Sequence, residues 1–385
     1  MSTSTPLDRF RHPDVRWAAQ SMPLLTTAFD ELGDVFAGLR IGMCLHIEPK
    51  TAVLCTLLAR AGATVALTGS PGTTRQDIAE ALSAAGVLVH ASAGDSAPRV
   101  DAVLDTDPHI LLDNGADLTQ GLLDRGDPPA HFLGGTEETT TGALLLRQRE
   151  TDVPFPVIVI NDSALKLLVE NRFGVGQSVV QGFMNATNRM IPGSRATVVG
   201  YGPCGRGVAQ TLRELGAQVT VVEIDPYRRI EAALEGHRIA DTRDALPGTQ
   251  LLFLATGHPD VLDDGDLAVL DDGVVIAGVG HRPWELDLAR LGTPLRQTGG
   301  TQTAHHDVYA QADGRRIVVL AATRMINLVA GGGNPIEAMD LGLTLQARSL
   351  AAIASGDFAD PGVHPVPAGI DRRIATAFAD RLAGR

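Results

Sequence analysis

The chain has 385 residues, of which 44% are hydrophobic and 20% charged, and its formal net charge is −13. This length predicts two domains with separate cores. The negative net charge argues against nucleic acid or an anionic membrane as a partner and favours a small-molecule substrate. The stretch Met1–Phe10 lacks a secretory pattern, and no apolar run approaches the roughly 18 residues of a membrane helix, so a cytoplasmic protein is expected.

The cysteine and histidine patterns do not indicate a metal site. Cys44, Cys55 and Cys204 are widely spaced in apolar or glycine-rich surroundings, which predicts buried free thiols instead of a disulfide framework or a zinc site. His305 and His306 form a pair without a partnering acid or thiol pattern, which is more typical of a solvated loop. No metal is therefore expected.

The first third of the chain alternates short β-type runs with helical ones, beginning with RIGMCLHI at 40–47. This rhythm predicts parallel strands joined by helices. Two later runs, HILLDNGADLT at 109–119 and HFLGGTEETTTG at 131–142, end in polar residues. Because ligands in open α/β sheets bind beyond the carboxyl ends of strands, these ends are expected to face a cleft.

A second series of strands begins after Ile191, with ATVVGYG, QVTVVEID, QLLFLATG, GVVIAGVG and RRIVVLA. The first of them carries the spacing Gly200-x-Gly202-x-x-Gly205, with Pro203 and Cys204 between the glycines and a helix after them. Glu223 closes the next strand about 20 residues later, as the dinucleotide fingerprint requires. The helix N-terminus would hold a pyrophosphate.

The acid of this fingerprint favours NAD over NADP. Glu223 would accept the ribose hydroxyls, and its carboxylate would repel a 2′-phosphate. Arg228 is the one nearby residue that argues for NADP. Later strand ends are expected to line the same crevice, and they hold Ala255, Thr256, Gly257, Val279, Gly280 and His281.

The predicted fold is α/β, with a Rossmann-type NAD-binding domain at 171–333 inserted in a larger α/β substrate-binding domain with a parallel sheet. The larger domain would comprise 1–170 and 334–385. Asp313-Gly314 is expected to form a hairpin turn. The tail from Asn334 is expected to be helical with a Pro-rich interruption.

Only two lysines occur, Lys50 and Lys166. Lys166 lies on a predicted helix just upstream of the fingerprint, together with Glu170 and Asn171. In a chain that otherwise avoids lysine, an amine at this position is expected to have a chemical role.

With these residues together, the chain resembles the S-adenosylhomocysteine hydrolase family from about Trp17 to its end. The resemblance is carried by MPLL, CLHI and TAVL around His46, DNGADLT, GGTEETTTG, NDSALK, GYGPCGRG, VVEIDP, GVGH, and MINL with the following GNP. It implies that bound NAD oxidises the 3′-hydroxyl of a nucleoside. The C4′ hydrogen then becomes acidic, the C5′ group leaves, water adds, and the hydride returns.

The resemblance also implies roles for individual residues. Lys166 matches the lysine at the 3′-hydroxyl, where a desolvated amine can act as a base. Glu138 matches the acid that holds a sugar hydroxyl, and His46 the histidine beside the 5′ leaving group. The remaining matches contact the cofactor or the sugar: Thr139, Thr140, Thr141, Asn161, Asn171, His281 and Asn327, with Glu170 where the family has aspartate. The plainer alternatives are a solvated helix lysine, a strand-edge threonine run and a packed core histidine.

Several departures from the family concern the substrate. After Asp113 the family has a second aspartate, whereas this chain has Asn114, which cannot transfer a proton. A family threonine and the adenine-reading acid or amide two residues later are replaced by Glu48 and Lys50, and an ammonium cannot accept a hydrogen bond from the adenine amine.

Two further departures concern the entrance that the family uses for the homocysteine tail. A family histidine is Asn334 here, and a family aromatic residue is Arg282. The chain also stops at Arg385. The family extension that reaches a neighbouring subunit is therefore expected to be missing, and a dimer is as plausible as a tetramer.

The sequence therefore predicts an NAD-dependent lyase, dehydratase or hydrolase acting on a nucleoside, specialised relative to the family hydrolase. The alternatives are a genuine S-adenosylhomocysteine hydrolase, a nucleoside 3′-oxidoreductase or epimerase, and a non-catalytic NAD-binding regulator. The expected partners are a small nucleoside substrate and other copies of the chain.

Overall fold

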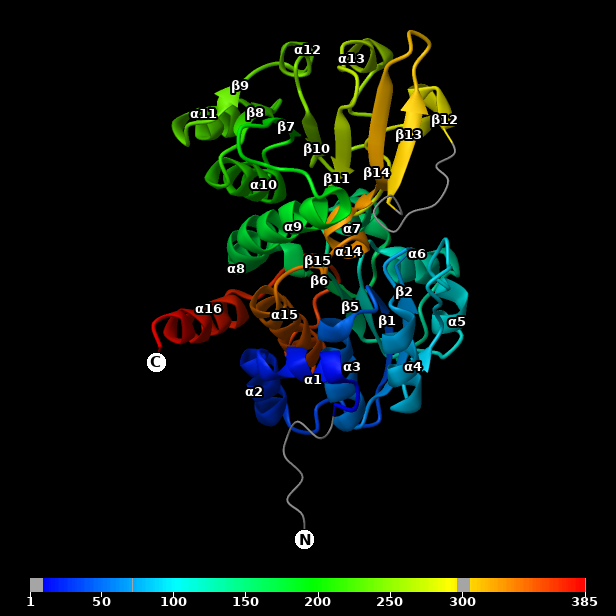
Figure 1. Ribbon diagram of the computed structural model, residues 1–385. Coiled ribbons are helices and arrows are strands. Elements are labelled where there is room, and N and C mark those ends of the chain that lie inside the picture. Colours follow the sequence, from blue (N-terminus) through cyan, green and yellow to red (C-terminus); the bar gives the residue numbers. More distant parts are fainter. Residues whose placement is uncertain (1–9, 71, 296–304, 385) are drawn as a thin grey trace. The chain divides into compact units, whose positions relative to one another are not determined.

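The computed structural model describes residues 10–70, 72–295 and 305–384, and the start of the chain, where no targeting signal is predicted, lies outside them. The chain forms two compact units (Figure 1). Unit 1 comprises Met1–Leu167 and Ile336–Arg385, and unit 2 comprises Leu168–Pro335. Among the described residues, no helix is long and apolar enough to cross a membrane.

Unit 1 is built on one sheet of seven described strands, in the order β15-β6-β5-β4-β1-β2-β3, and all its pairings are parallel. The strands are β1 (Arg40–Leu45), β2 (Thr64–Gly69), β3 (Leu88–Val89), β4 (Ile110–Asp113), β5 (Gly134–Glu137), β6 (Pro156–Val159) and β15 (Gly362–Pro365). Strand β15 corrects the expectation for the tail, because the Pro-rich interruption contains a strand that pairs with β6.

Helices cover both faces of this sheet. They are α1 (Pro13–Gln20), α2 (Pro23–Leu32), α3 (Pro49–Arg60), α4 (Gln76–Ala84), α5 (Val100–Leu104), α6 (Asp117–Asp124), α7 (Thr140–Gln148), α8 (Ala164–Lys166), α15 (Ile336–Ala354) and α16 (Ala368–Leu382), with short 3₁₀ turns η1 (Glu150–Asp152) and η2 (Ile160–Asp162). Helices α5, α6 and α7 enclose one core cluster with the sheet, whereas α15 packs against β4 and β5.

Helix α15 also ties the end of the chain to its beginning. The carboxylate of Asp340, which is fully buried, accepts hydrogen bonds from the backbone N–H groups of Leu24 (3.1 Å) and Leu25 (2.8 Å) in the first turn of α2. These N–H groups have no partner inside their own helix, so Asp340 caps α2 from a distant part of the sequence.

Unit 2 holds an eight-stranded sheet of described strands in the order β12-β13-β14-β11-β10-β7-β8-β9. The strands are β7 (Arg195–Val199), β8 (Gln218–Val222), β9 (Arg238–Ile239), β10 (Leu251–Leu254), β11 (Val275–Gly278), β12 (Thr293–Leu295), β13 (His306–Ala310) and β14 (Arg316–Met325). Strands β13 and β14 pair antiparallel around Asp313-Gly314, which confirms the predicted hairpin. His306 lies in β13, where its Nε2 contacts the carbonyl oxygen of Ala186 at 2.9 Å, so the expected solvated loop was wrong for this residue.

The helices of unit 2 are α9 (Val175–Thr187), α10 (Pro203–Glu214), α11 (Pro226–Leu234), α12 (Thr242–Ala245), α13 (Asp264–Ala268) and α14 (Ile326–Val329), with the 3₁₀ turn η4 (Leu288–Leu291). A core cluster that includes α9 and α10 forms on one face of the sheet and another that includes α13 on the other face. The fold is thus α/β with a Rossmann-type unit, as the sequence predicts.

Candidate active site

The strand order of unit 1 explains why its polar strand ends lie together. Strands β6, β5, β4 and β1 are parallel neighbours, so their carboxyl ends form one edge of the sheet. Asn161, Glu138, Asn114 and His46 follow these four strands in turn. From β1 the chain adds β2 and β3 on one side, and it then returns to add β4, β5 and β6 on the other side. The point between β1 and β4 is therefore a topological switch point, where open α/β sheets bind ligands.

Asn114 and Glu138 are joined directly. The Asn114 Nδ2 donates to Glu138 Oε2 at 3.0 Å, and both side chains are buried. The other amide atom, Asn114 Oδ1, is buried without a hydrogen-bond partner among the described residues. An amide therefore takes the place of the family carboxylate beside Glu138, where a second carboxylate would repel it.

His46 follows β1 and is held from two sides. Its Nδ1 lies 2.8 Å from Thr73 Oγ1, and its carbonyl oxygen accepts from Thr51 Oγ1 at 2.6 Å. The imidazole is half-buried at the same sheet edge as Asn114. This placement is compatible with proton transfer to a ligand at the strand ends.

Glu48 and Lys50, at the start of α3, form a buried ion pair. Lys50 Nζ lies 2.7 Å from Glu48 Oε2, and the two side chains are only 6% and 8% exposed. Glu48 is also the N-cap of α3, and its oxygens accept from the backbone N–H groups of Lys50 (3.1 Å) and Thr51 (3.2 Å). Since a charge removed from water is costly unless it is paired and hydrogen-bonded, the two residues form one fixed group.

Lys166 ends the short helix α8 and is 4% exposed. Ser163 caps this helix: its Oγ accepts from the Lys166 N–H at 3.0 Å and itself donates to Asp371. Upstream, Asn161 Nδ2 donates to Thr140 Oγ1 at 2.8 Å. The buried placement of the amine differs from that of a solvated helix lysine.

Asp113 and Glu137 lie side by side at the ends of β4 and β5, and both are fully buried. Burial, followed by the negative charge of neighbouring acids, raises the pKa of both carboxyl groups above their ordinary values. Asp113 accepts from the N–H groups of Asn114 (3.0 Å) and Thr119 (2.8 Å). In the structure Asp113 therefore braces its own loop, and the substrate contact that we assign to it from the family resemblance stays a prediction.

The sequence did not single out Glu137. Of the two adjacent glutamates, Glu138 alone was expected to matter. Glu137 ends β5 and Glu138 follows the strand, so only the strand boundary and the hydrogen bonds of each carboxylate distinguish them.

In unit 2 the fingerprint glycines form a close-packed turn between β7 and α10. Gly200 has φ +97°, and a Cβ there would lie 2.7 Å from the carbonyl oxygen of Ala255. A Cβ on Gly205 would lie 2.0 Å from the Gly200 carbonyl oxygen. Gly202 differs, because its Cβ would meet only Arg228 Nη1, at 3.5 Å. Packing within the protein thus requires glycine at 200 and 205, whereas the absence of a side chain at Gly202 leaves an open backbone that a ligand can approach.

This open backbone matches the needs of a dinucleotide. Pro203 begins α10, and no described side chain caps its N-terminus, so the positive end of the helix dipole can face an anion. Glu223 lies beside the turn, where its carboxylate accepts from the N–H groups of Tyr201 (2.7 Å), Ile224 (2.7 Å) and Asp225 (3.0 Å). Its oxygens retain lone pairs for ribose hydroxyls.

The switch point of unit 2 lies between β7 and β10, so Gly200 and Thr256 follow neighbouring strands. Glu285, which the sequence did not single out, braces the Thr256 loop. Its Oε1 accepts from the N–H groups of Thr256 (2.6 Å) and Gly257 (3.0 Å) and from Thr256 Oγ1 (2.6 Å). Val279 and Gly280 follow the next strand, β11, which ends at Gly278.

Glu170 and Asn171 lie in a π-helical segment, η3 (Leu167–Gly174). π-Helical turns are rare and are frequent at functional sites. Asn334 connects this segment to two others: its Nδ2 donates to Glu170 Oε1 (3.3 Å), and its Oδ1 accepts from Ser178 (3.0 Å) and Asn327 (3.2 Å). The asparagine that replaces a family histidine is therefore part of a polar network.

Two more residues of unit 2 are predicted to contact the cofactor. Asn327 Oδ1 is buried with no hydrogen-bond partner in the described part of the chain, so it can accept from a bound amide. Burial, and then the charge of Arg282, lowers the pKa of His281 to about 4, so this imidazole is neutral at pH 7. The Arg282 guanidinium lies 5.5 Å from the centre of the Trp284 ring. The glycine cradle, the helix end and the orphaned amide oxygen together fit NAD.

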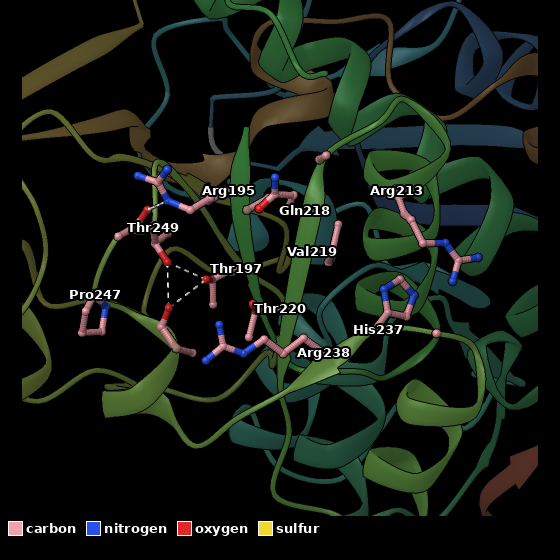
Figure 2. A pocket seen from close by; sticks show the side chains of 15 residues that line it. Arg195, Thr197, Arg213, Gln218, Val219, Thr220, His237, Arg238, Pro247 and Thr249 are labelled. Carbon is pink, nitrogen blue, oxygen red and sulfur yellow. Dashed lines mark hydrogen bonds between the residues drawn. The ribbon is translucent and has the colours of Figure 1, made fainter. Parts of the chain in front are cut away.

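A separate cavity of about 340 Å³ opens in unit 2 at the amino ends of β7 and β8 (Figure 2). Its lining includes Arg195, Arg213, Arg238 and His237. Because the fingerprint loop follows the opposite end of β7, this cavity is distinct from the predicted cofactor site.

Comparison with known proteins decides the family. The NAD-binding domain of S-adenosyl-L-homocysteine hydrolase matches residues 171–333, and the S-adenosyl-L-homocysteine hydrolase model matches residues 5–130. The chain belongs to the S-adenosyl-L-homocysteine hydrolase family. It is therefore an NAD-binding enzyme, and NAD is its cofactor.

Similarity to curated relatives covers almost the whole length of this chain. It is 39% identical to the S-inosyl-L-homocysteine hydrolase of Methanopyrus kandleri, over 94% of this chain and 88% of the relative. It is also 39% identical to the S-inosyl-L-homocysteine hydrolase of Methanosarcina mazei, over 94% of this chain and 90% of the relative. The adenosylhomocysteinase of Thermococcus kodakarensis is 36% identical, over 94% of this chain and 88% of the relative.

Proposed function

We propose that this enzyme hydrolyses an S-nucleosyl-L-homocysteine whose base is a 6-oxopurine, through transient oxidation of the 3′-hydroxyl. The observation that carries the proposal is the buried pair of Glu48 and Lys50, 2.7 Å apart. The pair presents a fixed carboxylate acceptor beside a fixed ammonium donor at the start of α3.

The edge of a 6-oxopurine complements this pair. Hypoxanthine offers an N1–H donor next to an O6 acceptor, so Glu48 can accept from N1–H while Lys50 donates to O6. Adenine offers the opposite order, an N1 acceptor next to an N6 donor. Relatives 39% identical to this chain bear the name S-inosyl-L-homocysteine hydrolase, and inosine carries hypoxanthine. The ion pair and the name of these relatives both support a 6-oxopurine as the proposed base.

The sugar chemistry is assigned to residues of unit 1. Bound NAD supplies the hydride acceptor and later returns the hydride. Lys166, whose amine is removed from bulk water, takes the proton of the 3′-hydroxyl. Glu138, held by the Asn114 amide, binds a sugar hydroxyl as acceptor. Asn161, held on Thr140, orients the same end of the substrate.

The C5′ chemistry is assigned to His46. The C4′ proton becomes acidic beside a 3′-ketone, and His46 takes it. The C4′–C5′ double bond then forms as the C5′ thiolate leaves, and His46 passes the proton to the thiolate. Water then adds across the C4′–C5′ bond, and the net reaction is hydrolysis. Because the Asn114 amide carries no transferable proton, His46 has no carboxylate neighbour at residue 114 to share this work. If water addition fails, the reaction ends as an elimination and the enzyme acts as a lyase.

The test compares S-inosyl- and S-adenosyl-L-homocysteine as substrates of the NAD-loaded protein, following free thiol. We expect kcat/KM to favour the inosyl compound by roughly 10–100-fold, equivalent to about 1–3 kcal/mol for a well-placed pair of hydrogen bonds. Products formed in D₂O should carry deuterium at C4′. Mass spectrometry separates inosine, the product of hydrolysis, from a 4′,5′-didehydronucleoside, the product of elimination.

A matched double variant tests the role of the pair. Glu48→Thr with Lys50→Glu installs the family arrangement and keeps a residue that can cap α3. The variant should reverse the preference toward the adenosyl substrate while its melting temperature stays close to that of the wild type. An unchanged preference would refute the assignment of base recognition to Glu48 and Lys50.

The second candidate function is hydrolysis of S-adenosyl-L-homocysteine. It is favoured by the relative named adenosylhomocysteinase, which is 36% identical to this chain. In that case the wild-type enzyme would prefer the adenosyl substrate.

A further inference from the structure

We infer that Glu137 is a positioning residue: its buried carboxylate clamps the loop after β4 to the turn after β5 and so holds Asn114 and Glu138 together. The carboxylate accepts four hydrogen bonds from these two segments. Oε1 accepts from Gly115 N (3.0 Å), Thr139 N (2.6 Å) and Thr139 Oγ1 (2.7 Å), and Oε2 accepts from Ala116 N (2.8 Å). The catalytic part of this inference rests on the proposed function.

The loop after β4 needs such an anchor because its backbone is strained. Gly115 and Ala116 both have positive φ, +101° and +62°. Glycine adopts this region freely, whereas alanine does so at a cost of roughly 1–2 kcal/mol. Ala116 is completely buried, and its N–H is directed at Glu137 Oε2. The hydrogen bond to Glu137 therefore offsets the strain of the left-handed alanine.

The turn after β5 is shaped around the same carboxylate. Thr139 is the N-cap of α7, and its Oγ1 accepts from Gly142 N at 2.9 Å while donating to Glu137. A Cβ on Gly142 would lie 2.3 Å from Glu137 Oε1 and 2.6 Å from Oε2, so glycine makes room for the carboxylate. The first turn of α7 and the loop after β4 thus share one acceptor.

The clamp bears on the site because Asn114 precedes Gly115 and Glu138 follows Glu137 directly. The bond between Asn114 Nδ2 and Glu138 Oε2 depends on the separation of these two segments. A shift of either loop would move the carboxylate that we assign to a sugar hydroxyl, and misplacement of about 1 Å can cost 10²-fold in rate.

The experiment replaces Glu137 by Gln in the NAD-loaded, full-length protein. A glutamine oxygen at the Oε1 position keeps three of the four bonds, but its NH₂ group then faces the Ala116 N–H, donor against donor. We expect hydrogen exchange of the amides in 114–119 to accelerate at least tenfold and kcat to fall roughly 10–100-fold, with a much smaller change in KM. Glu150→Gln, an exposed glutamate just after α7, should change neither quantity.

A rescue variant separates positioning from general stability. Adding Ala116→Gly to Glu137→Gln removes the strained alanine, so it should restore both loop protection and most of kcat. If the double variant regains protection but not kcat, or if Glu137→Gln leaves exchange of 114–119 unchanged, the inference is wrong.

A second variant displaces the carboxylate from the other side. Gly142→Ala places a methyl group against Glu137 and should reproduce the faster exchange even if Glu137→Gln does not fold. Hydrogen exchange does not depend on turnover, so these variants decide the structural clamp even if the wild-type enzyme accepts neither nucleosyl substrate. That separate result would refute only the proposed function.

Discussion

At the scale of single residues, His281 shows how desolvation sets the charge of a side chain that is predicted to face the cofactor. Desolvation, followed by the Arg282 charge, lowers its pKa from 6.5 to about 4. At pH 7 the imidazole is neutral and can both donate and accept hydrogen bonds. A neutral side chain is compatible with the positively charged nicotinamide ring of NAD, whereas an imidazolium would repel it.

This shift predicts a pH dependence of stability. Between pH 6.5 and 4 the unfolded chain binds a proton at His281 and the folded chain does not, so the free energy of unfolding falls as pH falls through this window. His281→Gln removes the contribution of this protonation to the free energy of unfolding. The stability of the wild type relative to this variant should therefore decrease from pH 6.5 to 4 in chemical denaturation. A difference that stays constant over this range would contradict the lowered pKa.

The buried Glu48–Lys50 pair and the choice between Glu137 and Glu138 were beyond sequence reasoning for a physical reason. A role for Lys50 was expected from its rarity and position, but the pairing of its ammonium with Glu48 was not. Both adjacent glutamates bind the loop after β4, and only the folded structure shows that Glu137 also accepts from Thr139 and so joins two segments. The proposed roles of the other site residues remain predictions.

At the scale of elements, strand β14 contains a left-handed bulge. Ala321, Ala322 and Thr323 have φ values of +52°, +51° and +58°. The pairing with β11 jumps there, from Ala277 opposite Leu320 to Gly278 opposite Met325. A Cβ on Gly278 would lie 1.8 Å from the Thr323 carbonyl oxygen, so glycine is required opposite the bulge. The bulge leads directly into α14, which carries Asn327.

This bulge predicts an unusual glycine effect. Ala322→Gly relieves left-handed strain and should raise the free energy of unfolding by about 0.5–1 kcal/mol, after the entropic cost of glycine. Ala377→Gly, at an exposed position within α16, should lower it by about the same amount. Urea unfolding measures both. Equal destabilisation by the two variants would mean that Ala322 is not strained.

The elements that the sequence predicted well are those with strong local signals. The fingerprint strand, its helix and the Asp313-Gly314 hairpin follow from spacing and turn chemistry. Strand β15 was missed because four residues flanked by prolines carry little strand propensity of their own. Pairing with β6 makes them a strand.

At the scale of the whole molecule, each unit has its own doubly wound sheet and its own switch point, so each presents polar strand ends at one edge. NAD is expected to bind unit 2 and to stabilise its folded state. At a free concentration 100 times Kd, the expected gain is about 2.7 kcal/mol.

A single methyl group should abolish this gain. Gly202→Ala has room within the protein, since the nearest atom, Arg228 Nη1, is 3.5 Å away, but its Cβ occupies the surface that the pyrophosphate approaches. We expect the variant to fold normally and to bind NAD at least tenfold more weakly, with little thermal shift on adding NAD. Gly369→Ala in α16, where nothing lies within 4 Å, is the matched control and should keep the full shift. Wild-type NAD affinity in Gly202→Ala would overturn this assignment of the cradle.

The sequence by itself determined the family, the cofactor and the fold class, because fingerprint spacing and strand–helix rhythm are local properties of the chain. The tertiary structure decided which side chains meet. Asn334 reaches Glu170 across 164 residues, Asp340 caps a helix 316 residues away, and Glu137 joins loops 22 residues apart. Such partners depend on packing and register, which bring distant segments to the same edge of a sheet. Local spacing carries no information about them.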